Sequence, residues 1–267
     1  MARTVWKPVA IGVAVIAILL LSQEIRDLAK AIGLPIPGFP VRYGGSGFDN
    51  LLAVLIVVIG ALLLLRRPAE LARDLGLRWN GWRAPALTAL ATLPFWIGVA
   101  ALGKPATDWS ALDLVMLAFA FPLAEEIVFR GFGFVLTRRG LRWPMGLAIA
   151  VQAIGFGLVH WYGAGGGGGA ALQIFAITAL GGAVFAIIDA MDGYAIGCGL
   201  VMHVSMNAAW VVFTPPDSMG TGWTGNALRL LSAALALLLV WKAGRREAAL
   251  TQVEAPHNSL SPAGRGL

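Results

Sequence analysis

Two long apolar runs limit what this chain can fold into more than any other feature of its sequence. They are LLAVLIVVIGALLLL at residues 51–65 and ALRLLSAALALLLVW at residues 227–241. Each is apolar around nearly the whole circumference of a helix and approaches membrane-spanning length. Of all residues, 58% are hydrophobic and only 13% are charged, and the mean hydropathy is +0.77. This composition excludes an ordinary soluble domain and predicts an integral membrane protein.

The pattern of apolar segments predicts an all-α, polytopic membrane helix bundle with about eight transmembrane helices. The expected spans are residues 8–22, 49–65, 85–103, 111–136, 143–162, 170–189, 193–213 and 227–242. The first span has no A-x-A-like site after it and is expected to stay uncleaved, with a secretory signal peptide as the alternative. The chain is expected to divide into four parts: N-terminal spans and loops (1–84), a core (85–213), a last span (214–242) and a polar, mobile tail (243–267).

The basic residues test the number of spans. With eight spans, fourteen Lys and Arg residues lie in segments on the side of the two termini. The opposite side holds Arg26, Lys30, Arg42 and Lys104. Because positive loops resist translocation, both termini are expected in the cytoplasm, and the chain is expected in an inner or plasma membrane.

Charge and cysteine content narrow the expected partners. Topology explains the net charge of +6, so membrane lipid is expected as a partner and nucleic acid is not. The single Cys198 excludes an intramolecular disulfide and a thiolate-rich metal site.

Few strongly polar side chains lie inside the expected spans. An ionisable group at membrane depth costs about 2.5–3.5 kcal/mol on insertion scales, so such groups are expected to be paired and to face the protein interior. Away from the span ends they are Glu125, Glu126, Arg130, His160, His203 and Asn207.

The fourth expected span carries three of these groups. Glu126 and Arg130 are four residues apart, so they share a helix face and can neutralise one another. Glu125 points about 100° away and has no local counter-ion, which suits it to proton transfer. Pro122 lacks an N–H and is expected to kink the helix and free a carbonyl. The alternative for these charges is a purely structural ion-pair cluster.

The other two polar segments carry histidines. His160 lies one helical turn after Phe156, and in HVSMN the side chains of His203 and Asn207 share a face. Their alternatives are an interfacial histidine and hydrogen-bonding contacts between helices. If the helices pack together, these groups and Glu125 meet in one water-reachable chamber.

Such a chamber has a chemical logic. Glu125 with His160 could deprotonate a water, while His203 and Asn207 could donate hydrogen bonds to the oxyanion that forms when water attacks a peptide carbonyl. Glu125, His160 and His203 also have the composition of a zinc site with water as the fourth ligand. The residues alone leave both chemistries open.

At these residues the chain resembles the CPBP family of CAAX proteases and bacteriocin-processing enzymes, also called the Abi family. The family motifs Glu-Glu-x-x-x-Arg, Phe-x-x-x-His and His-x-x-x-Asn correspond to EEIVFR (125–130), FGLVH (156–160) and HVSMN (203–207), in order and on separate spans. The resemblance covers about residues 85–213 and shows no departure within the motifs.

The resemblance implies an intramembrane endopeptidase. By position, Glu125 and His160 would activate water and His203 and Asn207 would form the oxyanion hole, supported by Glu126, Arg130 and Phe156. It implies a peptide or protein substrate, lipidated or membrane-associated, and no cofactor, with zinc as the rival because the family was long described as metalloproteases.

Two other classes remain open at this point. In a proton-coupled transporter, the same groups would form a proton relay, and replacing Glu125 would abolish transport without any cleavage. A non-catalytic membrane scaffold or immunity protein would keep its phenotype in Glu125→Gln.

Overall fold

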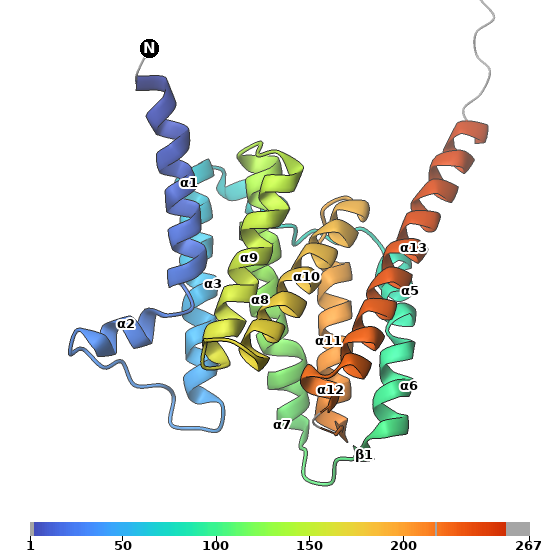
Figure 1. Ribbon diagram of the computed structural model, residues 1–267. Coiled ribbons are helices and arrows are strands. Elements are labelled where there is room, and N and C mark those ends of the chain that lie inside the picture. The colour runs from blue at the N-terminus through green and yellow to red at the C-terminus, as the bar shows by residue number, and fades with distance from the viewer. Residues whose placement is uncertain (1–2, 217, 255–267) are drawn as a thin grey trace, which may run out of the picture.

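The computed structural model describes residues 3–216 and 218–254 of the chain, and nearly all of its elements are helices (Figure 1). The first half contains α1 (Arg3–Leu21), α2 (Ile25–Ala31), α3 (Gly44–Leu65), η1 (Pro68–Glu70), α4 (Leu71–Asp74), α5 (Arg83–Ala91), α6 (Leu93–Leu102) and β1 (Lys104–Pro105). The second half contains α7 (Ala111–Asp113), η2 (Leu114–Ala120), α8 (Phe121–Glu125), η3 (Glu126–Gly140), α9 (Met145–Gly163), α10 (Ala170–Met191), α11 (Gly197–Val212), β2 (Phe213–Thr214), α12 (Ser218–Thr221) and α13 (Trp223–Glu254).

The long helices form a multi-pass bundle, as the sequence predicts. Within the described residues, five helices are long and apolar enough to cross a membrane, and a sixth span results if the bent pair Pro8–Leu21 and Ile25–Ala31 is one span. The five are Gly44–Leu65, Arg83–Leu102, Met145–Gly163, Ala170–Met191 and Trp223–Arg245. The all-α membrane class is therefore confirmed, while the count of eight stays a prediction.

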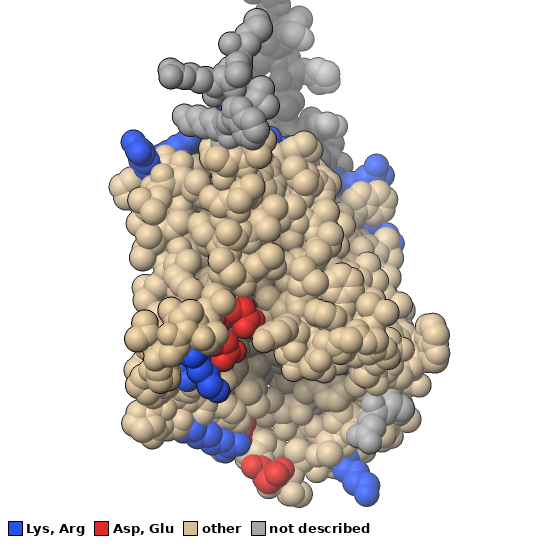
Figure 2. All heavy atoms as spheres, turned by 60° about the vertical axis from the view of Figure 1, so that its left-hand side comes forward, with Lys and Arg blue, Asp and Glu red and all other residues tan. Residues whose placement is uncertain are grey.

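Both described ends of the chain lie at the same end of the bundle (Figure 1). Much of the visible surface in Figure 2 is uncharged, and Lys and Arg gather near its upper and lower parts. Such an apolar belt suits contact with acyl chains. The side of the membrane that the termini face stays a prediction.

The last helix is longer than expected. α13 extends past residue 242 to Glu254, so residues 243–254 of the expected mobile tail are helical, and the rest of that tail lies outside the described residues. At the opposite end of the bundle, β1 pairs with β2 in a two-residue antiparallel contact that joins the end of α6 to the end of α11.

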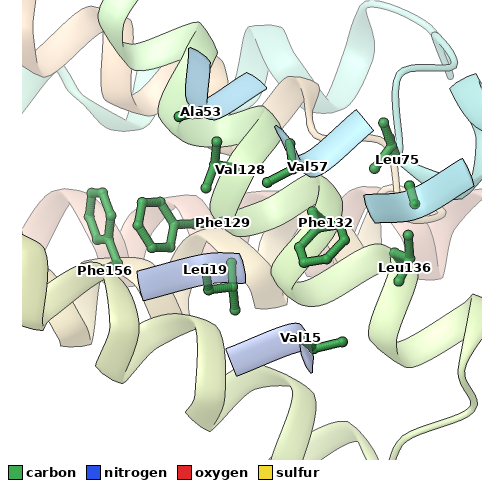
Figure 3. Packing of buried hydrophobic residues seen from close by; sticks show 11 residues of the cluster. Val15, Leu19, Ala53, Val57, Leu75, Val128, Phe129, Phe132, Leu136 and Phe156 are labelled. Carbon is green, nitrogen blue, oxygen red and sulfur yellow. The ribbon is translucent and has the colours of Figure 1, made fainter. Parts of the chain in front are cut away.

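The segment η2–α8–η3 is the central element of the fold. η2 and η3 are π-helical, and α8, which contains Pro122, separates them. π-Helical turns are rare and frequently mark functional sites. Residues 128–137 of η3 are buried, and four of their side chains pack with α1, α3 and α9 in the main apolar cluster (Figure 3).

Glycine lets neighbouring helices approach η3 closely. A Cβ added at Gly133 would lie 2.8 Å from Cβ of Gln152 on α9 and 3.1 Å from Cδ2 of Leu19 on α1. Both distances are shorter than ordinary van der Waals contacts. Small residues at helix contacts are what membrane bundles use, because lipid supplies no hydrophobic force between helices.

We therefore expect Gly133→Ala to destabilise the bundle by overpacking, at a cost of about 1–3 kcal/mol. The matched control is Gly146→Ala on α9, where an added Cβ meets no atom within 4 Å. The temperature at which detergent-solubilised protein loses its monodisperse chromatographic peak should fall in Gly133→Ala and not in Gly146→Ala. Equal thermal stability of the two variants would contradict this packing.

Candidate active site

A buried ion pair lies at the centre of the candidate site. Nη2 of Arg130 donates to Oε1 of Glu126 over 2.6 Å, and both side chains are fully buried. This is the contact that their spacing predicts. The Arg130 guanidinium also lies between two rings, with Cζ 4.3 Å from the centroid of Phe156 and 4.9 Å from that of Phe185. The pair thereby joins η3 to α9 and α10.

His203 on α11 connects this pair to Glu125. Its Nδ1 lies 2.8 Å from Oε1 of Glu126, the oxygen that also accepts from Arg130. A carboxylate accepts hydrogen bonds, so Nδ1 of His203 carries a proton. Its Nε2 then faces Glu125, with Oε2 at 3.7 Å. The two adjacent carboxylates thus lie on opposite sides of one imidazole, and Glu126 forms the hydrogen bond that fixes it.

Asn207 also contacts the fourth span. Its Nδ2 donates to the carbonyl of Leu117 over 3.1 Å. In a π-helix that carbonyl would accept from the N–H five residues later, which is the position of Pro122, and proline has no N–H. The carbonyl that Pro122 frees therefore accepts from Asn207, and the second hydrogen of the amide stays available for another acceptor.

His160 is fixed by its own helix. Its Nδ1 lies 2.9 Å from the carbonyl oxygen of Phe156, and its ring packs on the Phe156 ring with centroids 4.4 Å apart. A carbonyl only accepts, so Nδ1 donates and Nε2 is left as an acceptor. The Phe156 ring is also 6.0 Å from the ring of His203, so this phenylalanine positions both histidines.

The candidate residues line two cavities, whereas the sequence predicts one shared chamber. A mainly apolar cavity of about 240 Å³ between α9, α10, α11 and α13 is lined by His160, His203 and Asn207. A second, more polar cavity of about 510 Å³ is lined by Glu125 and again by Asn207. Asn207 and Trp210 contribute to both, so the cavities adjoin at α11.

A polar contact lies at the edge of the second cavity. Oδ1 of Asp113 accepts from Oη of Tyr43 over 2.5 Å and pairs with Nη2 of Arg42 at 2.6 Å. The bond to Asp113 raises the pKa of the Tyr43 phenol above its ordinary value. All three residues line the cavity that reaches Glu125, and they give it a polar route suited to water.

Asp189 is a buried member of this network that sequence reasoning missed. Its Oδ1 accepts from the backbone N–H of Gly199 at 2.8 Å. A Cβ added at Gly199 would lie 2.9 Å from Oδ2 of Asp189 and 3.1 Å from Oε2 of Glu126. Only glycine therefore lets the start of α11 approach both carboxylates. Asp189 is the last residue of the expected span 170–189, but α10 continues to Met191 and buries it.

The candidate zinc ligands do not assemble into a metal site. Within residues 3–216 and 218–254, no group of three or more His, Cys, Asp and Glu side chains could hold a metal ion together. Glu125, His160 and His203 accordingly do not fit a zinc site in this arrangement.

Comparison with known proteins identifies the segment that carries this site. Residues 107–209 match the family model described as Type II CAAX prenyl endopeptidase Rce1-like. The chain contains an Rce1-like domain. No curated protein and no solved structure gives a match. The Rce1-like domain runs from the loop before α7 to α11, and it includes all three motifs of the candidate site.

The match confirms the resemblance to the CAAX protease family. At the family level, the match over residues 107–209 supports a CAAX-protease-like intramembrane endopeptidase, and the long apolar helices indicate a multi-pass membrane protein.

The buried pair in the Rce1-like domain gives a stability prediction. Arg130→Met leaves Glu126 charged and without its main partner, so the unfolding free energy should fall by about 3–5 kcal/mol. Adding Glu126→Gln removes the orphaned charge and should restore much of that loss. Thermal unfolding in detergent measures both. A double variant no more stable than Arg130→Met would contradict the role of the pair.

Proposed function

We propose that the chain hydrolyses a peptide bond of a lipidated or membrane-associated substrate, with water activated by Glu125 and His160 and the oxyanion stabilised by His203 and Asn207. One observation supports this most: three helices bring these side chains around two adjoining cavities that share Asn207. The more polar cavity suits water, and the apolar one suits a peptide.

The proposed reaction begins where the two cavities adjoin. Water enters through the polar cavity and lies against Glu125, whose side chain is 24% exposed and thus able to receive it. A proton leaves the water as its oxygen attacks the carbonyl carbon of the peptide. Glu125 accepts this proton, while Nε2 of His160, which is free of the Phe156 carbonyl, accepts a hydrogen bond from the water and orients it.

The oxyanion of the tetrahedral intermediate requires donors. Asn207 offers the amide hydrogen that Leu117 does not take, and His203 donates from Nε2 when that nitrogen is protonated. The C–N bond then breaks, and the proton taken from water passes to the leaving amine. Every atom of the water ends in the two products.

The supporting residues keep this arrangement fixed. Glu126 and Arg130 neutralise one another and orient His203, while Phe156 packs on both histidines. Side chains locked in this way lose little freedom when substrate binds, which favours precise positioning. The expected membrane is the inner or plasma membrane, and neither a metal nor another cofactor enters the scheme.

The direct test of this function uses a fluorogenic peptide that ends in a CAAX motif with a prenylated cysteine. Purified protein in detergent should cleave it, and Glu125→Gln and His160→Ala should each lower kcat by at least about 100-fold, because positioned proton transfer contributes 10²–10⁴. A chelator should leave the rate unchanged. The matched control Glu70→Gln, at an exposed ion pair with Arg67, should behave as wild type.

Two results would overturn the proposal. The first is cleavage by Glu125→Gln at the wild-type rate, which would remove the carboxylate from the mechanism. The second is loss of cleavage on chelation with recovery on adding zinc, which would replace the proposed water activation by metal chemistry.

The oxyanion role gives a second prediction. Asn207→Ala should lower kcat by about 10²–10³ with little change in KM, since the lost donor acts mainly in the transition state. Ser205→Ala is the control on the same helix, because Ser205 bonds to Thr92 and Trp96 away from the site. Steady-state kinetics on the same peptide measure both, and an unchanged kcat in Asn207→Ala would count against the assignment.

A further inference from the structure

Arg229 is a second intramembrane arginine that the proposed mechanism leaves unused. Of the 20 Lys and Arg residues in the sequence, three lie inside the expected spans: Arg130, Arg229 and Lys242, which is the last residue of its span. Arg130 is neutralised by Glu126. Arg229 lies on α13, outside the Rce1-like match, and in the part of the chain that the structure describes it makes no ion pair with a carboxylate.

The neighbours of the Arg229 guanidinium are neutral. Its Nη1 donates to the carbonyl of Gly220 over 3.3 Å and to Oδ1 of Asn226 over 3.1 Å. Its Cζ lies 5.5 Å from the ring centroid of Phe95 and 5.4 Å from that of Trp210. A guanidinium has five N–H donors, so these contacts hold it in place without satisfying Nη2 and Nε.

Arg229 also lines the apolar cavity of the candidate site. The polar side chains that share this cavity with it include His160, His203 and Asn207, and the wall is otherwise mainly apolar. In such surroundings an unpaired cation favours an anion strongly, and guanidinium binds a carboxylate through two parallel hydrogen bonds. The cavity therefore combines an apolar wall, the proposed catalytic groups and one fixed positive charge.

We infer that Arg229 binds the C-terminal carboxylate of the peptide substrate. This inference rests on the proposed function, because it takes the apolar cavity as the peptide site. A volume of about 240 Å³ is small for a chain that enters and leaves, and it suits the end of a chain. A bound terminal carboxylate would fix how far from its end the peptide meets His160, His203 and Asn207.

The experiment measures binding, so it does not depend on turnover. The probes are two dansyl-labelled peptides that end in a prenylated CAAX motif, one with a free C-terminal acid and one with a C-terminal amide. Both are titrated by fluorescence anisotropy into full-length Glu125→Gln protein in nanodiscs of phosphatidylcholine. We expect the acid to bind at least about tenfold more tightly than the amide, as a charge-assisted pair predicts.

Substitution then assigns the preference to Arg229. Adding Arg229→Met should bring the two dissociation constants within about twofold, because binding of the acid peptide weakens and binding of the amide peptide does not change. Arg229→Lys should keep part of the preference, because it keeps the charge and loses the bidentate geometry. The control is Arg139→Met, another arginine stacked on an aromatic ring, Tyr194, which should retain the full preference.

Several outcomes would overturn the inference. The first is equal affinity for the acid and the amide peptide in protein that carries Arg229. The second is an equal loss of affinity for both peptides in Arg229→Met, as a purely structural role of Arg229 predicts. The third is that neither peptide binds. Nanodiscs with phosphatidylglycerol test lipid phosphate as the alternative anion, and loss of the acid preference only in that lipid would indicate that phosphate competes for Arg229. A wild-type protein that binds with this preference but cleaves nothing would refute the proposed function and leave the carboxylate site standing.

Discussion

The structure depends on one oxygen atom, Oε1 of Glu126, which accepts hydrogen bonds from both Arg130 and His203. Two charges buried without partners would destabilise any helix bundle, but here they neutralise one another one helical turn apart. Because the acceptor lies on η3 and one donor on α11, the same oxygen fixes how these two segments face each other. Phe156 of α9 then packs on the guanidinium and fixes the third segment.

This arrangement separates a polar cavity, which suits water, from an apolar cavity, which suits a membrane-associated peptide. Hydrolysis of a peptide in a membrane must bring the two together. Glu125 lies on the polar side, near the cavity edged by Tyr43 and Asp113, and His160 lies on the apolar side. Asn207 belongs to both. In the proposed mechanism, a peptide in the apolar cavity would meet water at α11, beside the proposed oxyanion donors His203 and Asn207.

Much of this organisation follows from the sequence. The apolar runs predict the membrane class, and helical spacing predicts that Glu126 contacts Arg130 and that His203 and Asn207 share a face. The three motifs in order lead to the family, and the Rce1-like match agrees. Spacing along a single helix accounts for the Glu126–Arg130 contact and for the shared face of His203 and Asn207, because each depends only on the geometry of one element.

Features that depend on packing between helices could not be predicted. Spacing does not show that Asn207 satisfies the carbonyl freed by Pro122, because this requires a π-helical turn and a neighbouring helix in register. It does not show that Asp189 is buried against Gly199, or that the chamber is divided in two. Arg229 lies near the start of a span, where an arginine usually reaches the interface, and only the structure shows its guanidinium turned toward the apolar cavity.

The most direct measurement is an experimental structure of the protein with a bound peptide analogue whose scissile bond is replaced by a phosphinate, a mimic of the tetrahedral intermediate. The account predicts phosphinate oxygens within hydrogen-bonding distance of Nδ2 of Asn207 and Nε2 of His203, with Glu125 on the side of the polar cavity. A phosphinate bound away from α11, or a Glu125 side chain turned toward lipid, would contradict it.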